Sequence, residues 1–138
     1  PQRTGTSIKC ALDYLLKVAK RKSVVFIISD FLDQDYWSSL KVVNRKHDVI
    51  GIRLYDHAET DMPDMGLAKV EDPETGESFW VDTSSKDART RLKKEIQIRQ
   101  EIFQKDTRKI GFDLIPISTN QDFVEPLMSF FRMREKRY

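Results

Sequence analysis

The chain has 138 residues, of which 39% are hydrophobic and 33% are charged. This balance is typical of one folded domain with its own core, and no apolar stretch is long enough to span a bilayer. The 24 basic and 22 acidic residues leave a net charge of +2, which argues against a dedicated nucleic-acid-binding protein. Because Cys10 is the single cysteine, we expect a reduced protein located in the cytoplasm.

The first part of the sequence alternates between helix and strand patterns. Apolar residues at three- and four-residue spacing predict a helix that begins at Thr6 or Ser7 and ends near Lys20. The continuous apolar run of residues 24–28 predicts a parallel strand covered by helices on both of its faces.

A second helix and a second strand follow the same alternation. Apolar residues on one helical face begin at Trp37, and the strand is expected over residues 49–54. This order predicts an α/β fold in which right-handed crossovers build a parallel sheet. Ligands of such folds gather at the carboxyl ends of the strands.

The middle of the chain predicts a loop, a hairpin and a long helix. Residues 56–65 lack periodicity and indicate a loop, whereas residues 68–71 and 78–81 flank a turn with proline and glycine. A long charged helix is expected to begin at Ser84 or Ser85 and to end near Thr107.

The end of the chain predicts one more strand and one more helix. Pro116 lacks an N–H group, so the strand over residues 112–117 should end at an edge or a bulge. The final helix is expected to begin near Asp122, with Pro126 in its first turn. Four apolar residues should form its packing face: Phe123, Leu127, Phe130 and Phe131.

Two residues stand out as candidates for a metal site. Asp30 ends a strand at the edge where α/β folds place function, and Thr6 precedes the helix expected beside that strand. Their oxygens suit Mg²⁺, although two ligands are too few for an octahedral ion. The alternative interpretation is that Thr6 caps its helix and Asp30 caps the turn after its strand.

Other charged residues have less specific interpretations. Five aspartates could form an acidic rim at one end of the sheet, but a solvated loop explains them as well: Asp33, Asp35, Asp56, Asp61 and Asp64. His47 lies among charged neighbours and is predicted to be at the surface. The sequence contains no Walker motif, nucleophile elbow or CxxC pair, so we assign no catalytic residue.

Several segments carry a resemblance to known families. Arg3–Leu12 and Phe26–Phe31 resemble the second half of a von Willebrand factor A-like domain. In that family a threonine and an aspartate of the metal-ion-dependent adhesion site match Thr6 and Asp30. The chain from about Arg3 to Arg132 is also similar to the bacterial domain of unknown function numbered fifty-eight. The segments that carry this similarity are Arg45–Gly51, Gly66–Leu67, Asp72–Glu77 and Trp80–Ser85.

The resemblance implies a Rossmann-like, three-layer fold of the von Willebrand factor A type, with an inserted β-hairpin and a long helix in a single domain over residues 1–138. It implies a Mg²⁺ site for protein recognition and a MoxR-type AAA+ ATPase as partner. Such sites also use an Asp-x-Ser-x-Ser motif, which does not occur here. The family's first half should therefore precede Pro1, and this chain should bind Mg²⁺ poorly by itself.

Three functional hypotheses remain. The first is a non-catalytic protein-interaction module, assisted by a metal and working with a MoxR-type ATPase. The alternative is a Mg²⁺-dependent phosphoryl-transfer or nuclease domain that uses Asp30, Asp33 and Asp56. The third is a metal-free, purely structural contact through the hairpin at Phe79 and Trp80 or through the long charged helix. An exposed Trp80 would favour a surface for a partner, whereas burial would make it part of the core.

Overall fold

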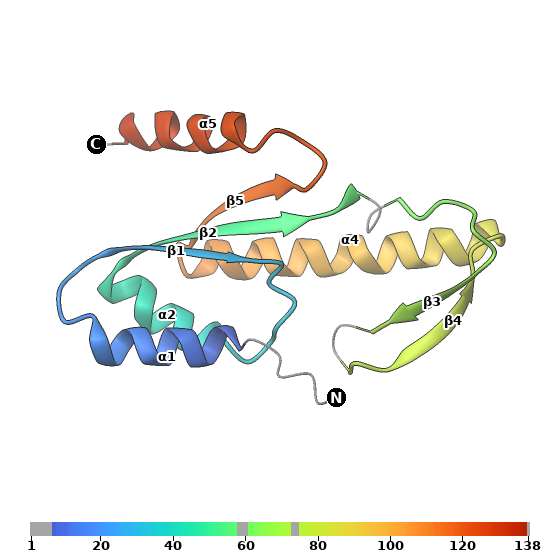
Figure 1. The fold of residues 1–138 in the computed structure, drawn as a ribbon, viewed down its shortest axis with the longest axis horizontal. Helices are drawn as coiled ribbons and strands as arrows, with labels where there is room; N and C mark the ends of the chain where they lie inside the picture. The colour runs from blue at the N-terminus through green and yellow to red at the C-terminus, as the bar shows by residue number, and fades with distance from the viewer. Residues whose placement is uncertain (1–6, 58–60, 73–74, 138) are drawn as a thin grey trace.

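The structure is a computed structural model that describes residues 7–57, 61–72 and 75–137. A parallel three-stranded sheet has helices on both faces, with α1, α2 and α4 on one face and α5 on the other (Figure 1). This arrangement confirms the predicted Rossmann-like, three-layer α/β fold. The elements are α1 (Ile8–Val18), β1 (Val24–Ser29), α2 (Trp37–Lys46), β2 (Asp48–Tyr55), β3 (Leu67–Glu71), β4 (Ser78–Asp82), α4 (Lys86–Lys109), β5 (Asp113–Ser118) and α5 (Val124–Glu135).

The sheet has the strand order β1-β2-β5, with β2 in the centre. Both pairs are parallel: Val24 lies opposite Asp48, and Ile50 lies opposite Asp113. Pro116 therefore belongs to an edge strand of the described sheet, as a residue without an N–H donor requires. The predicted hairpin also forms, because β3 and β4 pair in antiparallel fashion.

Serine caps fix where two of the helices begin. The Ser7 hydroxyl accepts a hydrogen bond from the backbone N–H of Cys10, and the Ser85 hydroxyl accepts one from Ala88, each over 3.4 Å. Each bond satisfies an N–H group that the first turn of a helix otherwise leaves without a partner. Of the alternatives that the sequence left open, Ser85 rather than Ser84 caps the long helix.

The larger core lies between the sheet and helices α1, α2 and α4. Its aromatic centre is Phe31, which packs 5.8 Å from the Phe103 ring of α4 and 6.0 Å from the Phe112 ring. Leu40 and Val43 of α2 are completely buried beneath the sheet. This side of the domain therefore matches the prediction of a sheet face covered by helices.

The second core lies between α5 and the opposite face of the sheet, of which α5 covers only a part. Phe130 packs with isoleucines of β2 and β5, the buried set being Ile50, Ile52, Ile115 and Ile117. On β1, however, Val24, Phe26 and Ile28 remain exposed. The prediction that helices cover both faces of this strand is thus wrong within the described residues, because α5 packs mainly over the other two strands.

Two further predictions about burial are wrong. His47 is buried rather than at the surface, and its Nδ1 accepts a hydrogen bond of 3.3 Å from the backbone N–H of Ser23. This bond ties the end of α2 to the segment that enters β1. On α5, Phe130 packs as expected, but Phe123 and Phe131 are exposed.

The first half of α4 extends past the sheet, and the hairpin β3–β4 lies near it (Figure 1). An ion pair of 3.8 Å between Arg99, just past the middle of α4, and Asp72, next to the end of β3, joins this helix to the hairpin. Among the described residues, no helix combines the length and the apolar character that crossing a membrane requires.

Candidate functional site

The carboxyl ends of the strands meet at one edge of the sheet, where the sequence placed its candidate residues. Asp30 is exposed directly after β1, and its Oδ1 accepts a hydrogen bond of 3.2 Å from the backbone N–H of Leu32. Asp56 follows β2, and its Oδ1 accepts one from the Asn120 side chain after β5, also over 3.2 Å. Asp30 thus caps the turn after its strand, as one of the two interpretations predicted.

The residue after Asp30 has a strained backbone. Phe31 has a φ angle of +58°, a conformation that bulky side chains rarely adopt and that costs about 1–3 kcal/mol. The Ser29 hydroxyl accepts a hydrogen bond from the Phe31 N–H over 3.1 Å. This bend sends the Phe31 ring into the core, while the Asp30 carboxylate stays at the surface.

Asp33 connects the loop after β1 to the beginning of α1. Its Oδ2 accepts a hydrogen bond of 3.0 Å from the Ile8 N–H, and its Oδ1 accepts one of 2.9 Å from the Gln34 N–H. The negative charge also suits the N-terminal end of a helix. The structure therefore brings the start of α1 beside the loop that contains Asp30. Thr6 lies outside the described residues.

We expect Asp33→Ala to lower the free energy of unfolding by about 1 kcal/mol, as the loss of a helix cap does. Denaturation with urea, followed by circular dichroism, would measure the change. Asp35→Ala is the matched control, because Asp35 is exposed in the same loop. Equal stability of the two variants would show that the contact to Ile8 contributes nothing.

Two polar residues under this edge were not singled out from the sequence. Tyr36 is buried, its hydroxyl has no hydrogen-bond partner among the described residues, and burial raises the pKa of its phenol above its usual value. The Arg53 guanidinium lies 5.2 Å from the centre of the Phe103 ring. Arg53 could have been noticed, because it is the one charged residue inside the apolar run of residues 49–54.

The described residues do not assemble a metal site by themselves. Within residues 7–57, 61–72 and 75–137, no group of three or more histidine, cysteine, aspartate or glutamate side chains could hold an ion. The Asp33 carboxylate accepts two backbone hydrogen bonds, and Asp56 binds Asn120. Of the two proposed ligands, the described part of the chain contributes Asp30 alone, which is too few for octahedral Mg²⁺.

The hairpin carries two large apolar side chains that are exposed to solvent. Trp80 is 67% exposed and Leu67 is 70% exposed. Leu67 pairs with Asp82 and Lys69 pairs with Trp80, so both side chains lie on one face of the hairpin. We call Leu67 and Trp80 the hairpin surface. The charged Lys69 and Asp82 share this face. Exposed aromatic and aliphatic side chains with polar residues around them are typical of contact sites for partners.

Buried hydrogen bonds hold the base of the hairpin in place. The Thr83 hydroxyl donates to the Gly66 carbonyl over 2.5 Å and accepts from the Met65 N–H over 2.9 Å. The Arg89 side chain of α4 donates to the Thr83 carbonyl over 2.5 Å. Because Thr83 is completely buried, these bonds fix both strands to α4. The hairpin surface is therefore presented on a rigid support.

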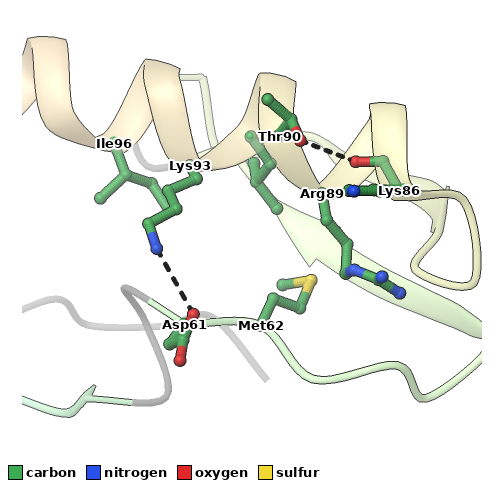
Figure 2. Close-up of a pocket in the computed structure, with 8 residues that line it drawn as sticks. Asp61, Met62, Lys86, Arg89, Thr90, Lys93 and Ile96 are labelled. Carbon is green, nitrogen blue, oxygen red and sulfur yellow. Dashed lines mark hydrogen bonds and ion pairs between the residues drawn. The ribbon is translucent and has the colours of Figure 1, made fainter.

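A pocket of about 230 Å³ lies between α4 and the loop before β3 (Figure 2). In it, the Lys93 ammonium pairs with the Asp61 carboxylate at 3.5 Å. Its lining residues are Asp61, Met62, Lys86, Arg89, Thr90, Leu92, Lys93 and Ile96. Of these residues, Asp61 is one of the aspartates that the sequence proposed for an acidic rim at one end of the sheet. In the structure its carboxylate faces Lys93 of α4.

Comparison with known proteins supports the resemblance to the domain of unknown function numbered fifty-eight. The model of the family described as "Protein of unknown function DUF58" matches residues 1–102. An uncharacterized protein of Mycobacterium avium is 26% identical over 129 residues, which cover 91% of this chain and 75% of that protein. Uncharacterized proteins of Mycobacterium bovis and Mycobacterium tuberculosis are each 27% identical over 99% of this chain. The chain spans 43% of the length of these last two relatives. No solved structure matches.

Proposed function

We propose that this chain, which belongs to the DUF58 family, is a non-catalytic protein-interaction module that works with a MoxR-type AAA+ ATPase. The ATPase partner is the one that the family resemblance implies. The proposal also locates the interaction in the cytoplasm, where a lone thiol such as Cys10 would stay reduced.

The observation that supports the proposal is the exposure of the hairpin surface. A tryptophan at a protein surface exposes a large apolar area to water, and its burial by a partner stabilises the complex. Trp80 and Leu67 provide such an area, and the hydrogen bonds of Thr83 hold their strands before a partner arrives. A surface that is already ordered loses less conformational entropy on binding.

A bound Mg²⁺ would add a second contact at the carboxyl edge. In this proposal Thr6 and Asp30 supply two oxygen ligands, and the remaining ligands come from outside the described residues. When bound, the ion would accept a carboxylate of the partner in an open coordination position. We expect the 138-residue chain to bind Mg²⁺ weakly, because the described residues supply so few ligands.

A binding experiment with the purified ATPase tests the proposal. We expect Trp80→Ala to weaken the complex at least about tenfold, as removal of a central interface aromatic does. Tyr14→Ala is the matched control, because Tyr14 is a large aromatic on α1 that is 66% exposed, close to the 67% of Trp80. Equal affinity of the two variants would contradict a role for the hairpin surface.

The metal and the absence of catalysis are tested separately. We expect removal of Mg²⁺ with a chelator, or Asp30→Ala, to weaken binding of the ATPase by the full-length protein. If neither treatment changes the affinity, the metal role is wrong and only the hairpin contact remains. Hydrolysis of nucleic acids or phosphate esters that depends on Asp30 would instead favour the phosphoryl-transfer alternative.

A further inference from the structure

One face of the long helix α4 is exposed along most of its length. The opposite face packs against the rest of the domain, through the partly buried Phe103 ring and the buried Thr107 side chain. Six exposed residues recur at alternating four- and three-residue spacing, which lines them up along one side of the helix. We call them the outer face of α4: Arg91, Glu95, Ile98, Ile102, Lys105 and Lys109.

The centre of the outer face is apolar. Ile98 is 47% exposed and Ile102 is 55% exposed, and the two lie one helical turn apart. Charged side chains follow them in both directions along the helix. Apolar residues at this spacing, with charged residues beside them, are typical of the seam along which two helices pair. The outer face therefore fits another helix rather than a small molecule.

The order of the charges indicates which helix fits. Glu95 lies five residues before position 100 and Lys105 lies five residues after it, while Ile98 and Ile102 lie two residues before and after it. Neither Glu95 nor Lys105 forms an ion pair with another described residue. A face with this symmetry is complementary to itself when one of the two helices is reversed. A second copy of α4 therefore matches both the apolar centre and the two charges, as a two-fold symmetric contact requires.

The charges that flank the outer face follow the same symmetry. Lys94 and Asp106 lie six residues on either side of position 100, and Arg99 and Glu101 lie one residue on either side. In an antiparallel pair of helices, each of these side chains is opposite one of the other sign. Arg99 and Asp106 already pair within their own chain, so their contacts with the second copy would extend existing ion pairs.

Charge also fixes the direction of packing. In a parallel pair each residue would face its own counterpart, so that Glu95 would lie opposite Glu95 and Lys105 opposite Lys105. Like charges at such positions repel one another. In the antiparallel pair, the unfavourable contact of the outer face is that of Arg91 with Lys109, which lies at either end, where water and salt screen it. The charge pattern therefore favours antiparallel packing.

We propose that two copies of this chain associate through antiparallel packing of their α4 helices about position 100. Ile98 of each copy packs against Ile102 of the other, and Glu95 of each copy forms an ion pair with Lys105 of the other. A contact along one helix buries less surface than a permanent dimer requires, so we expect the association to be weak and to depend on concentration. The outer face does not include the hairpin surface, so this inference does not depend on the proposed ATPase contact.

Sedimentation equilibrium of the purified protein at a series of concentrations tests the association, under reducing conditions so that the exposed Cys10 cannot link two copies. We expect a dimer that Ile98→Asp weakens at least about tenfold, because the substitution places a charge in the apolar centre of the contact. Val42→Asp is the matched control, since Val42 is 52% exposed on α2, close to the 47% of Ile98. A protein that stays monomeric up to about 1 mM would overturn the proposal, and so would an equal effect of the two substitutions.

A charge reversal tests the antiparallel arrangement. Glu95→Lys or Lys105→Glu alone should weaken the dimer about tenfold, because each places like charges opposite one another at both symmetric contacts. The two substitutions together should recover most of the affinity, since the ion pairs then form with their signs exchanged. Both residues are exposed, so circular dichroism should show an unchanged fold in all three variants. Equal affinities of the single and double variants, as a parallel pair would give, would overturn the proposal.

Discussion

Gly51→Val should lower the free energy of unfolding by about 2–3 kcal/mol, because it forces extra volume into a packed core. A Cβ atom at position 51 would lie 2.4 Å from Cζ of Phe112 and 2.9 Å from Cδ1 of Leu114. Gly51 is in the central strand, so the neighbouring strands limit how far its backbone can move. Equilibrium unfolding in urea would measure the loss.

A double variant tests whether the Phe112 ring causes this loss. Gly51→Ala and Phe112→Leu each remove stability alone, but the smaller leucine makes room for the added methyl group. We expect the combined loss to be smaller than the sum of the two single losses. If the stability losses of the two single variants simply add, the Phe112 ring is not what opposes a side chain at position 51.

Arg134→Met should lower the free energy of unfolding by about 2 kcal/mol, because Asp48 loses a charge-assisted hydrogen bond, whereas Asp113 keeps its ion pair of 3.6 Å with Arg137. The Arg134 side chain is 14% exposed, and its Nη2 lies 2.5 Å from Asp48 while its Nε lies 3.7 Å from Asp113. These aspartates begin β2 and β5, so the arginine of α5 ties the helix to the start of both strands. Thermal unfolding would measure the change.

Arg132→Met is the control for this prediction, since Arg132 is exposed on the same helix. We expect it to change stability by less than about 0.5 kcal/mol, as surface substitutions usually do. Arg134→Lys should recover only part of the lost stability, because the lysine ammonium group lacks the planar, forked guanidinium with which Arg134 contacts both aspartates. A similar loss for Arg132 and Arg134 would rule out the specific ion pairs.

Local patterns were sufficient to predict the helices, the strands and the parallel sheet. Leu12 lies on the buried face of α1, and Leu40 and Val43 lie on the buried face of α2. The apolar spacing that marks such a face can be recognised within a few residues of sequence. Coverage of β1 was predicted wrongly for a different reason. An apolar run shows that a strand could be buried, but the elements that cover it come from elsewhere in the chain. Nothing within residues 24–28 indicates that the described helices cover only one face.

The candidate site was predicted less completely than the fold. The turn at Asp30 follows from short-range hydrogen bonding, which sequence can indicate. The contact of Asp33 with Ile8 joins residues 25 positions apart, and the burial of His47 depends on Ser23 in another segment. His47 was predicted to be exposed because its neighbours in the sequence are charged. Such long-range contacts can be identified only from the tertiary structure, because no local sequence pattern distinguishes the residues that make them from residues in solvated loops.

The long helix α4 has a mechanical consequence. Arg89 holds the hairpin at one end of this helix, and Phe103 packs under Arg53 nearer the other. The two residues are about 21 Å apart along the helix axis, at 1.5 Å per residue. A tilt of about 5° at the hairpin would thus move the Phe103 end by about 2 Å. A partner that tilted α4 on binding at Trp80 would in this way shift the aromatic packing under the carboxyl edge.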